Sequence, residues 1–365
     1  MSMTIFRLVF GLLNWVLILS LQVSNILSWD SIVRYNVKLK VIIMKNYRQQ
    51  PPYTIQIEPT EGCNLGCSFC GLQGMKKNGK TPWNFMTTQT ATAIASRIAR
   101  AGWTAKIIFA MHGEPTLNKD LFEIVKIFRK NLPNNRFHII SNGCGFVRGN
   151  GGLTPTEYCK RLFDAGINHI LLDNYSPDGD WKAVVDDVKD AFTIMYLGKD
   201  KTPMFRTDKG KDIIVLPSIE TTKISLVRNL KNHCGAAFPL DDKYNNKRCA
   251  VPFRELSFRY DGNVAICCDD FRGKYHIGNI RDYNGIDDLW NNKRFQAARV
   301  MLYNAKRSFA PCKGCTSLSM RVGLLPDKLG KDTLEPISEE VELFTQAIGK
   351  KGYLSNTIVK RPWEK

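Results

Sequence analysis

Short runs of aliphatic residues alternate with amphipathic segments over the first two thirds of the chain. The runs typical of buried strands cover residues 53–59, 105–110, 136–141, 168–174 and 212–218. Between them, apolar positions recur at helical spacing in residues 87–101, 118–131, 154–166 and 180–192. Aliphatic strands separated by helices are typical of a parallel sheet covered by helices, either a barrel or a doubly wound sheet. The alternation stops near residues 236–248, AAFPLDDKYNNKR, where we predict a domain boundary.

Residue types at the predicted helix ends support these limits. Thr154 and Glu157 have the spacing of a capping box, and Pro155 stands at the first helical position. Gly102 and Gly166 follow the last helical positions of their segments, where glycine is the favoured terminating residue.

Three cysteines lie directly after the first predicted strand, in the sequence EGCNLGCSFC of residues 61–70. In parallel α/β folds, ligands bind at the carboxyl ends of the strands, which is where this loop falls. Three thiolates, Cys63, Cys67 and Cys70, can hold an iron–sulfur cubane and leave one iron open to a substrate. A structural zinc is the alternative, but its fourth ligand would have to come from elsewhere, with His112 as one candidate.

A second group of cysteines stands near the other end of the chain, in RCAVPFRELSFRYDGNVAICCDD (248–270) and PCKGC (311–315). The segment FRYDGNVAIC alternates around Asp-Gly and predicts a β-hairpin. Its cysteines, together with the C-x-x-C pair, could hold one closed 4Fe–4S cluster or a zinc ion. Cys267 is favoured over the adjacent Cys268, which could substitute for it. Cys144, Cys159 and Cys234 stand alone, so we expect small buried hydrophobes there.

Length and composition allow one large domain and a smaller one. The chain has 365 residues, 44% of them hydrophobic and 24% charged, which is ample for a buried core. Eleven clustered cysteines with short gaps favour metal binding in a reducing compartment over a disulfide framework. The net charge of +18 comes from scattered Lys and Arg, so we expect a solvated basic surface. That surface still permits an acidic substrate.

The amino-terminal region has three interpretations. Residues 8–27 are mostly apolar and about long enough to span a bilayer, although they contain polar residues. As an anchor they would leave the rest of the chain in the cytoplasm, because basic residues follow them. A signal peptide would need a cleavage site that is not evident. We favour the third interpretation, in which translation begins at Met44 and the protein is cytoplasmic.

The cysteine loop resembles the signature loop of the radical S-adenosylmethionine (SAM) superfamily, including the aromatic Phe69 before the third cysteine. After the second predicted strand, MHGEPT (111–116) is similar to the family's GGEP motif, with Gly113, Glu114 and Pro115 as the matching residues. His112 replaces the first glycine of that motif. After the third strand, Ser141 and Asn142 stand where the family places polar groups. Taken singly, Glu114 could be a solvated acid and Ser141-Asn142 a turn, but their coincidence with the cysteine loop favours a SAM site.

The second cysteine group resembles the SPASM/twitch extension that follows many radical SAM cores. Its matching positions are Cys249, Cys267, Cys312 and Cys315, with Gly262 at the expected spacing. The resemblance implies an α/β fold, a partial (β/α)6 barrel followed by a small, hairpin-containing, cysteine-rich domain. We therefore predict a leader over 1–43, a radical SAM core over 50–235, an auxiliary-cluster domain over 245–320 and a tail over 321–365.

The same resemblance implies an enzyme that reductively cleaves SAM to a 5′-deoxyadenosyl radical and removes hydrogen from a substrate. It implies two 4Fe–4S clusters, one open to SAM and one auxiliary, and a reducing partner such as flavodoxin or ferredoxin. The expected outcome is oxidation or modification of a peptide, protein side chain or sugar. The alternatives are a radical enzyme that modifies RNA or nucleotides, and a zinc-binding module without catalysis. No specific nucleic acid is predicted as a partner.

Overall fold

The computed structural model describes residues 51–76, 82–148, 151–175, 179–196, 211–216, 232–303 and 305–317. The apolar segment 8–27, Met44 and the predicted tail 321–365 lie outside these residues. Within the described ranges, no helix is long and apolar enough to cross a membrane. The domain limits and the cytoplasmic location stay predictions.

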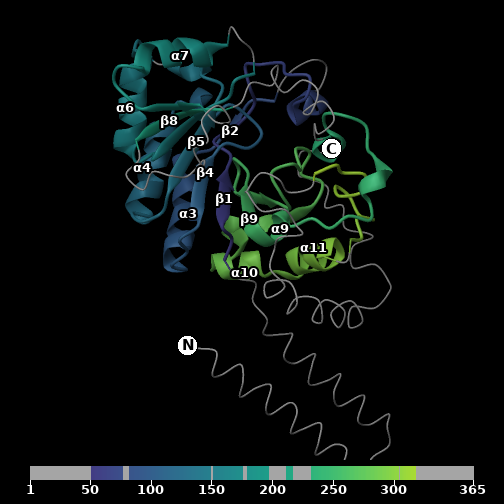
Figure 1. The fold of residues 1–365 in the computed structure, drawn as a ribbon. Helices are drawn as coiled ribbons and strands as arrows, with labels where there is room; N and C mark the ends of the chain where they lie inside the picture. The colour runs from purple at the N-terminus through teal and green to yellow at the C-terminus, as the bar shows by residue number, and fades with distance from the viewer. Residues whose placement is uncertain are drawn as a thin grey trace, which may run out of the picture. The chain divides into compact units, whose positions relative to one another are not determined.

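A nine-stranded sheet organises the described part of the chain, in the order β11-β10-β9-β1-β4-β5-β6-β8-β7 (Figure 1). Six neighbouring strands from the first two thirds of the chain run parallel, which confirms the parallel sheet expected from the aliphatic runs. They are β1 (Thr54–Ile57), β4 (Lys106–Phe109), β5 (Phe137–Ser141), β6 (His169–Leu172), β8 (Asp212–Val215) and β7 (Ile194–Tyr196). The sequence did not predict β7, which lies at the sheet edge although it precedes β8 in the chain.

Four amphipathic helices lie along the sheet and contact one another in chain order (Figure 1). They are α3 (Thr88–Arg100), α4 (Leu121–Asn131), α6 (Pro155–Ala165) and α7 (Asp180–Val188). The capping box at Thr154 and Glu157 is present, as predicted. Helix α4 begins later than its periodicity suggests because Asn118 is held elsewhere, donating its side-chain amide to the carbonyls of Pro59 and Met86.

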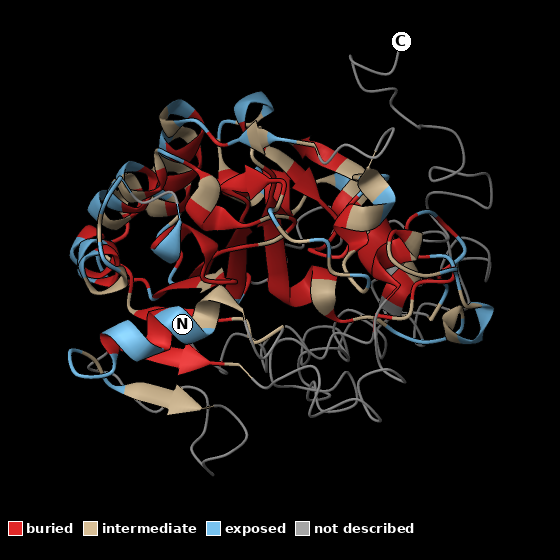
Figure 2. Ribbon diagram, turned by 90° about the horizontal axis from the view of Figure 1, so that it is seen from above, coloured by how far each residue is buried: buried red, intermediate tan, exposed pale blue. Residues whose placement is uncertain are grey.

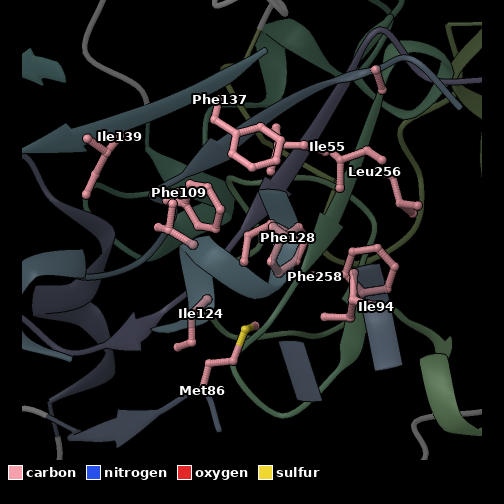
Figure 3. Packing of buried hydrophobic residues seen from close by; sticks show 14 of the residues in the cluster. Ile55, Met86, Ile94, Phe109, Ile124, Phe128, Phe137, Ile139, Leu256 and Phe258 are labelled. Carbon is pink, nitrogen blue, oxygen red and sulfur yellow. The ribbon is translucent and has the colours of Figure 1, made fainter. Parts of the chain in front are cut away.

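The main core lies between the strands and these helices, where the strands are buried along their length (Figure 2). Phe109 of β4 packs edge-on against Phe128 of α4 and Phe137 of β5, at ring-centre distances of 5.3 and 5.8 Å (Figure 3). Because β-strands that are buried on both faces need apolar residues at every position, the unbroken aliphatic runs are explained by this packing.

The predicted hairpin is present and continues the same sheet. Strands β9 (Glu255–Phe258) and β10 (Asn263–Ala265) are antiparallel around Asp261 and Gly262, and β11 (His276–Asn279) follows β10. Strand β9 also pairs in parallel with β1, with Thr54 opposite Glu255. Helices α9 (Val251–Arg254), α10 (Ile286–Trp290) and α11 (Lys293–Tyr303) complete this half. The second cysteine group is therefore joined to the strand that precedes the first.

Candidate functional site

The three motif loops meet at the carboxyl ends of adjacent strands. The cysteine loop follows β1, residues 111–116 follow β4, and residues 141–143 follow β5. The amide of Glu114 donates to the carbonyl oxygen of Gly62 at 2.8 Å, which joins the first two loops. Gly113 is required at this contact, because an added Cβ would lie 2.2 Å from the carbonyl oxygen of Thr60 and 2.4 Å from that of Gly62. Sheet topology therefore brings the motifs together.

Glu114 accepts hydrogen bonds from residues of two of the loops and is only 3% exposed. Its Oε1 accepts from the hydroxyls of Thr116 and Ser141, at 2.6 and 2.7 Å, and from the Thr116 amide at 3.1 Å. Its Oε2 accepts from the Asn142 amide at 2.8 Å. Burial raises the pKa of this carboxyl, and the hydrogen bonds oppose the shift. Glu114 is therefore a buried, oriented acceptor, and the interpretation as a solvated acid was wrong.

Asn142 connects the Glu114 carboxylate to the first cysteine, Cys63. Its Nδ2 lies 3.5 Å from Cys63 Sγ and 3.0 Å from Asn64 Oδ1. The carboxylate, the Ser-Asn pair and the cysteine loop thus form one contiguous polar surface. Gly143 follows with a φ of 91° and begins the short helix α5 (Cys144–Val147). Pro115 begins the short 3-10 helix η2 (Pro115–Leu117), for which Glu114 is the N-cap.

The three thiols of the cysteine loop are partly buried and close enough to influence one another's charge. Burial raises the pKa of Cys63 to about 12, and the neighbouring Glu114, Cys67 and Cys70 add to the shift. Burial, with Cys70, raises the pKa of Cys67 to about 11. The amide of Cys70 donates to the carbonyl of Cys67 at 3.0 Å, which keeps the last turn tight. Without a ligand, the Cys63 and Cys67 thiols therefore stay protonated at neutral pH, and a ligand that binds thiolates would have to displace their protons.

Phe69 contacts a residue after the end of β6 that the sequence analysis did not single out, Tyr175. Its ring packs edge-on against Tyr175, with ring centres 5.2 Å apart. The preceding Asn174 has a buried Oδ1 that finds no hydrogen-bond partner among the described residues. A buried polar atom without a partner is an available contact for a ligand. The available sequence signal was the set of polar residues Asp173, Asn174 and Tyr175 at the end of the fourth aliphatic run.

The second cysteine group is joined by a thiol that the prediction did not include. The four predicted ligands, Cys249, Cys267, Cys312 and Cys315, lie within range of one another's charges. Cys234 joins them, with its Sγ donating to Cys315 Sγ at 3.6 Å. That hydrogen bond lowers the pKa of Cys315 despite burial. Cys144 and Cys159 are buried small residues, as expected, but the same expectation for Cys234 missed its thiol partners.

The adjacent Cys268 presents its backbone to other partners. Its amide donates to Glu255 Oε1 at 3.2 Å, and its carbonyl oxygen faces His112. In the described part of the chain, no three Cys, His, Asp or Glu side chains are arranged tightly enough to hold a single metal ion. The cysteine groups therefore bring thiols near one another without forming a single-ion shell.

Arg307 forms hydrogen bonds to both ends of the second cysteine group, the segment before Cys249 and the C-x-x-C turn. Its guanidinium is 1% exposed and donates to the carbonyl oxygens of Lys247 and Arg248, both at 2.8 Å, and of Cys315 at 2.7 Å. The segment before Cys249 and the C-x-x-C turn are thereby held together. This buried arginine lies outside both motifs, so spacing alone gave no signal for it.

A small apolar cluster lies where the segment after the cysteine loop meets a segment of the second cysteine group. The 3-10 helix η1 (Gly71–Met75), directly after Cys70, packs against η3 (His233–Gly235), and Leu72, Ala236 and Phe271 form a buried cluster there. The ring of Phe271 lies between those of His112 and His233, at 4.2 and 5.0 Å. Because Cys63 and Cys70 also pack against this cluster and Cys234 belongs to η3, the segments that carry the two cysteine groups are in contact here.

His112, which replaces a glycine of the motif, packs against Phe271 of this cluster. Its Nδ1 lies 2.8 Å from Glu58 Oε1, and its Nε2 lies 2.9 Å from the carbonyl oxygen of Cys268. Burial raises the pKa of Glu58, but the charges of His112 and Arg259 outweigh it and hold that pKa below its usual value. Both ring nitrogens are engaged, so His112 links the two halves and is not a ligand for the cysteine loop.

Two family models match the chain. The model of the radical SAM superfamily matches residues 57–191, and the model of SPASM, an iron-sulfur cluster-binding domain, matches residues 249–316. Together the two matches span more than half of the chain.

Among curated proteins, the chain is similar to the S-adenosyl-L-methionine-dependent 2-deoxy-scyllo-inosamine dehydrogenase of Niallia circulans. The two are 22% identical over 273 residues, which is 73% of this chain and 94% of the relative. The GTP 3′,8-cyclase of Pectobacterium atrosepticum is 25% identical over 145 residues, covering 38% of this chain and 42% of the cyclase. The first similarity thus runs through both halves, and the second covers less than half of either protein.

Among solved structures, the crystal structure of BtrN in complex with AdoMet and 2-DOIA has the same fold. Its TM-score is 0.57 at 23% identity, over 76% of this chain and 98% of that one. Motif geometry, the two family models and this fold agree. The chain therefore belongs to the radical SAM superfamily and carries a SPASM-type iron–sulfur domain at its carboxyl side.

Proposed function

We propose that this radical SAM enzyme carries out a net two-electron oxidation of a sugar-like substrate, converting a carbinol to a carbonyl group. The observation that carries the proposal is the second cysteine group, whose segment η3 packs against η1, directly after the cysteine loop. The similarity over 94% of a SAM-dependent dehydrogenase supports the same reaction class. An oxidation needs a place for the electron that the substrate loses, and a second cluster would provide one.

The cysteine loop suits a 4Fe–4S cluster with an open iron, because Cys63, Cys67 and Cys70 supply three thiolates and no fourth. When bound, that cluster and SAM supply reductive cleavage to methionine and a hydrogen-abstracting 5′-deoxyadenosyl radical. Flavodoxin or ferredoxin is the proposed source of the electron.

Glu114, Ser141 and Asn142 are the proposed SAM contacts. Glu114 already accepts three hydrogen bonds at Oε1 but one at Oε2, so Oε2 retains the capacity to accept from an ammonium group. The side chain of Asn142 lies between this carboxylate and Cys63. Phe69, Gly113 and Pro115 would shape the loops, and Tyr175 would support Phe69.

Cys249, Cys267, Cys312 and Cys315 are the proposed ligands of the auxiliary 4Fe–4S cluster. Four thiolates leave no open iron, which suits electron transfer rather than SAM binding. In the net reaction, the carbinol carbon would lose a hydrogen atom to the 5′-deoxyadenosyl group and its hydroxyl a proton to solvent, and the cluster held by these four cysteines would supply the acceptor for one electron. The substrate thereby gains a C=O bond, and atoms and charge balance.

The test uses the full chain, reconstituted without oxygen, with a chemical reductant and SAM. Candidate substrates are aminocyclitols such as 2-deoxy-scyllo-inosamine, a cysteine- or serine-containing peptide, and nucleotides. We expect a ketone and 5′-deoxyadenosine in equal amounts with an aminocyclitol or related polyol. Transfer of deuterium from the carbinol carbon to 5′-deoxyadenosine would identify the reacting position.

Two outcomes would contradict the proposed reaction. A product formed only from nucleotides or RNA would support the alternative radical chemistry instead, and oxidation confined to the peptide would replace the substrate class. Uncoupled deoxyadenosine with every candidate would leave the SAM chemistry intact and remove the support for these substrates.

A further inference from the structure

Cys234 does not belong to the pattern of cysteines that identified the auxiliary site. That pattern runs from Cys249 through Gly262 to Cys267 and then to the C-x-x-C pair, and Cys234 stands 15 residues before it. A closed 4Fe–4S cluster takes four cysteine ligands, and this site brings Cys234 against two of the four proposed ones. If those four hold the cluster, Cys234 has another task.

The contacts of Cys234 place it against two of the proposed ligands. Its Sγ donates to Cys315 Sγ at 3.6 Å and also contacts the thiol of Cys267. The side chain is 4% exposed, so the surrounding water is excluded from these contacts. A thiol is a weak donor in general, but a buried one that faces thiolates meets strong acceptors.

The backbone holds Cys234 in this position at some conformational cost. His233 and Cys234 have φ angles of 45° and 58°, in the left-handed region that residues with a side chain rarely adopt. Asn232 fixes the segment to the C-x-x-C turn: its side-chain amide donates to the Gly314 carbonyl at 2.6 Å, and its backbone amide donates to the Thr316 hydroxyl at 2.9 Å. Strained backbone persists where the surroundings determine it, and it concentrates at functional sites.

The same segment touches the other cysteine group. An added Cβ on Gly71, the residue after Cys70, would lie 2.9 Å from Cβ of His233, and one on Gly74 would lie 1.8 Å from the carbonyl oxygen of Ala236. Cys234 is therefore carried by an element that also touches the segment directly after Cys70.

We infer that Cys234 is a non-ligating hydrogen-bond donor to the auxiliary cluster, donating to the Cys315 and Cys267 thiolates and raising the reduction potential of that cluster. The inference rests on the proposed auxiliary cluster. Hydrogen bonds to cluster sulfurs stabilise the extra negative charge of the reduced form, so they favour uptake of an electron. Cys234 would thus help the auxiliary cluster accept the electron that the substrate loses.

The test compares the full-length wild type with Cys234→Ala, Cys234→Ser and the control Cys159→Ala, which removes a buried thiol from α6. Iron and sulfide are counted after anaerobic reconstitution, and the midpoint potential of each cluster is measured by redox titration followed by electron paramagnetic resonance. We expect about eight irons in all four proteins. The auxiliary potential should fall in Cys234→Ala, recover in part in Cys234→Ser, and stay unchanged in Cys159→Ala.

Four results would overturn the inference. Loss of about four irons in Cys234→Ala would make Cys234 a ligand. An auxiliary potential equal to that of the wild type would remove the donor role, as would an equal shift in Cys159→Ala. About four irons in the wild type itself would instead remove the auxiliary cluster of the proposed function, and the inference with it.

Discussion

A single methyl group at Gly113 should damage the SAM site, whereas the same change at Gly66 should not. In Gly113→Ala the new Cβ would lie 2.2 Å from the Thr60 carbonyl oxygen and 2.4 and 2.6 Å from the carbonyl oxygen and nitrogen of Gly62. All three atoms belong to the backbone, and ordinary contact begins at 3.4 Å, so the two loops must separate by about 1 Å.

The expected cost follows from that overlap. Forcing an extra methyl group into a closely packed site costs about 1–3 kcal/mol, which lowers stability without unfolding a chain of this size. The separation would also stretch the 2.8 Å hydrogen bond from the Glu114 amide to Gly62, which precedes Cys63. SAM binding should therefore fall more than stability does. Gly66 is the matched control, because its added Cβ meets nothing within 4 Å in the same cysteine loop.

The assay combines three measurements on the two variants and the wild type. Guanidinium denaturation gives the free energy of unfolding, iron and sulfide analysis gives cluster content, and calorimetry gives the affinity for SAM. We expect Gly113→Ala to lose about 1–3 kcal/mol of stability and at least about tenfold in affinity. Equal behaviour of Gly113→Ala and Gly66→Ala would refute the argument that these loops are held in contact by an obligatory glycine.

Three further changes test other parts of the site. Glu114→Gln replaces an acceptor with a donor in a buried site, so affinity for SAM should fall at least about tenfold by calorimetry, with the exposed Glu123→Gln unchanged. Arg307→Met leaves three buried carbonyls without their donor and should cost at least about 2 kcal/mol in denaturation and about four irons, which an unchanged iron count would contradict. In the cluster-free protein, burial raises the pKa values of Cys63 and Cys67 to about 12 and about 11, from a usual value of 9.0. Their contribution to stability is therefore complete below pH 9 and lost as the pH rises toward those values, so the decline in the free energy of unfolding above pH 9 should be shallower when both are alanine.

Much of the site was predictable because its residues stand at strand ends. Once the parallel sheet was inferred, topology alone required the cysteine loop, Glu114 and Ser141-Asn142 to lie at one edge. The hairpin around Asp261-Gly262 was also predictable, because its turn residues and alternating strands are local signals.

The remaining features depend on contacts between distant parts of the chain. The parallel pairing of β9 with β1 joins residues about 200 positions apart and leaves no local signal. Cys234 contacts Cys315 across 81 positions, without a recognisable spacing. His112 looked like a departure from a glycine motif, whereas its partners Glu58 and Cys268 explain it. The roles of residues whose partners come from distant elements can be assigned only from the folded structure.

The most direct test of the central claim is made on the full chain without oxygen, by counting iron and sulfide and measuring 5′-deoxyadenosine after reduction with SAM. We expect about eight irons and deoxyadenosine from the wild type. We expect Cys67→Ala to keep the auxiliary cluster, with about four irons, and to form no deoxyadenosine. A colourless protein with intact SAM, or a Cys67→Ala variant that still forms deoxyadenosine, would contradict the account of two clusters with separate tasks.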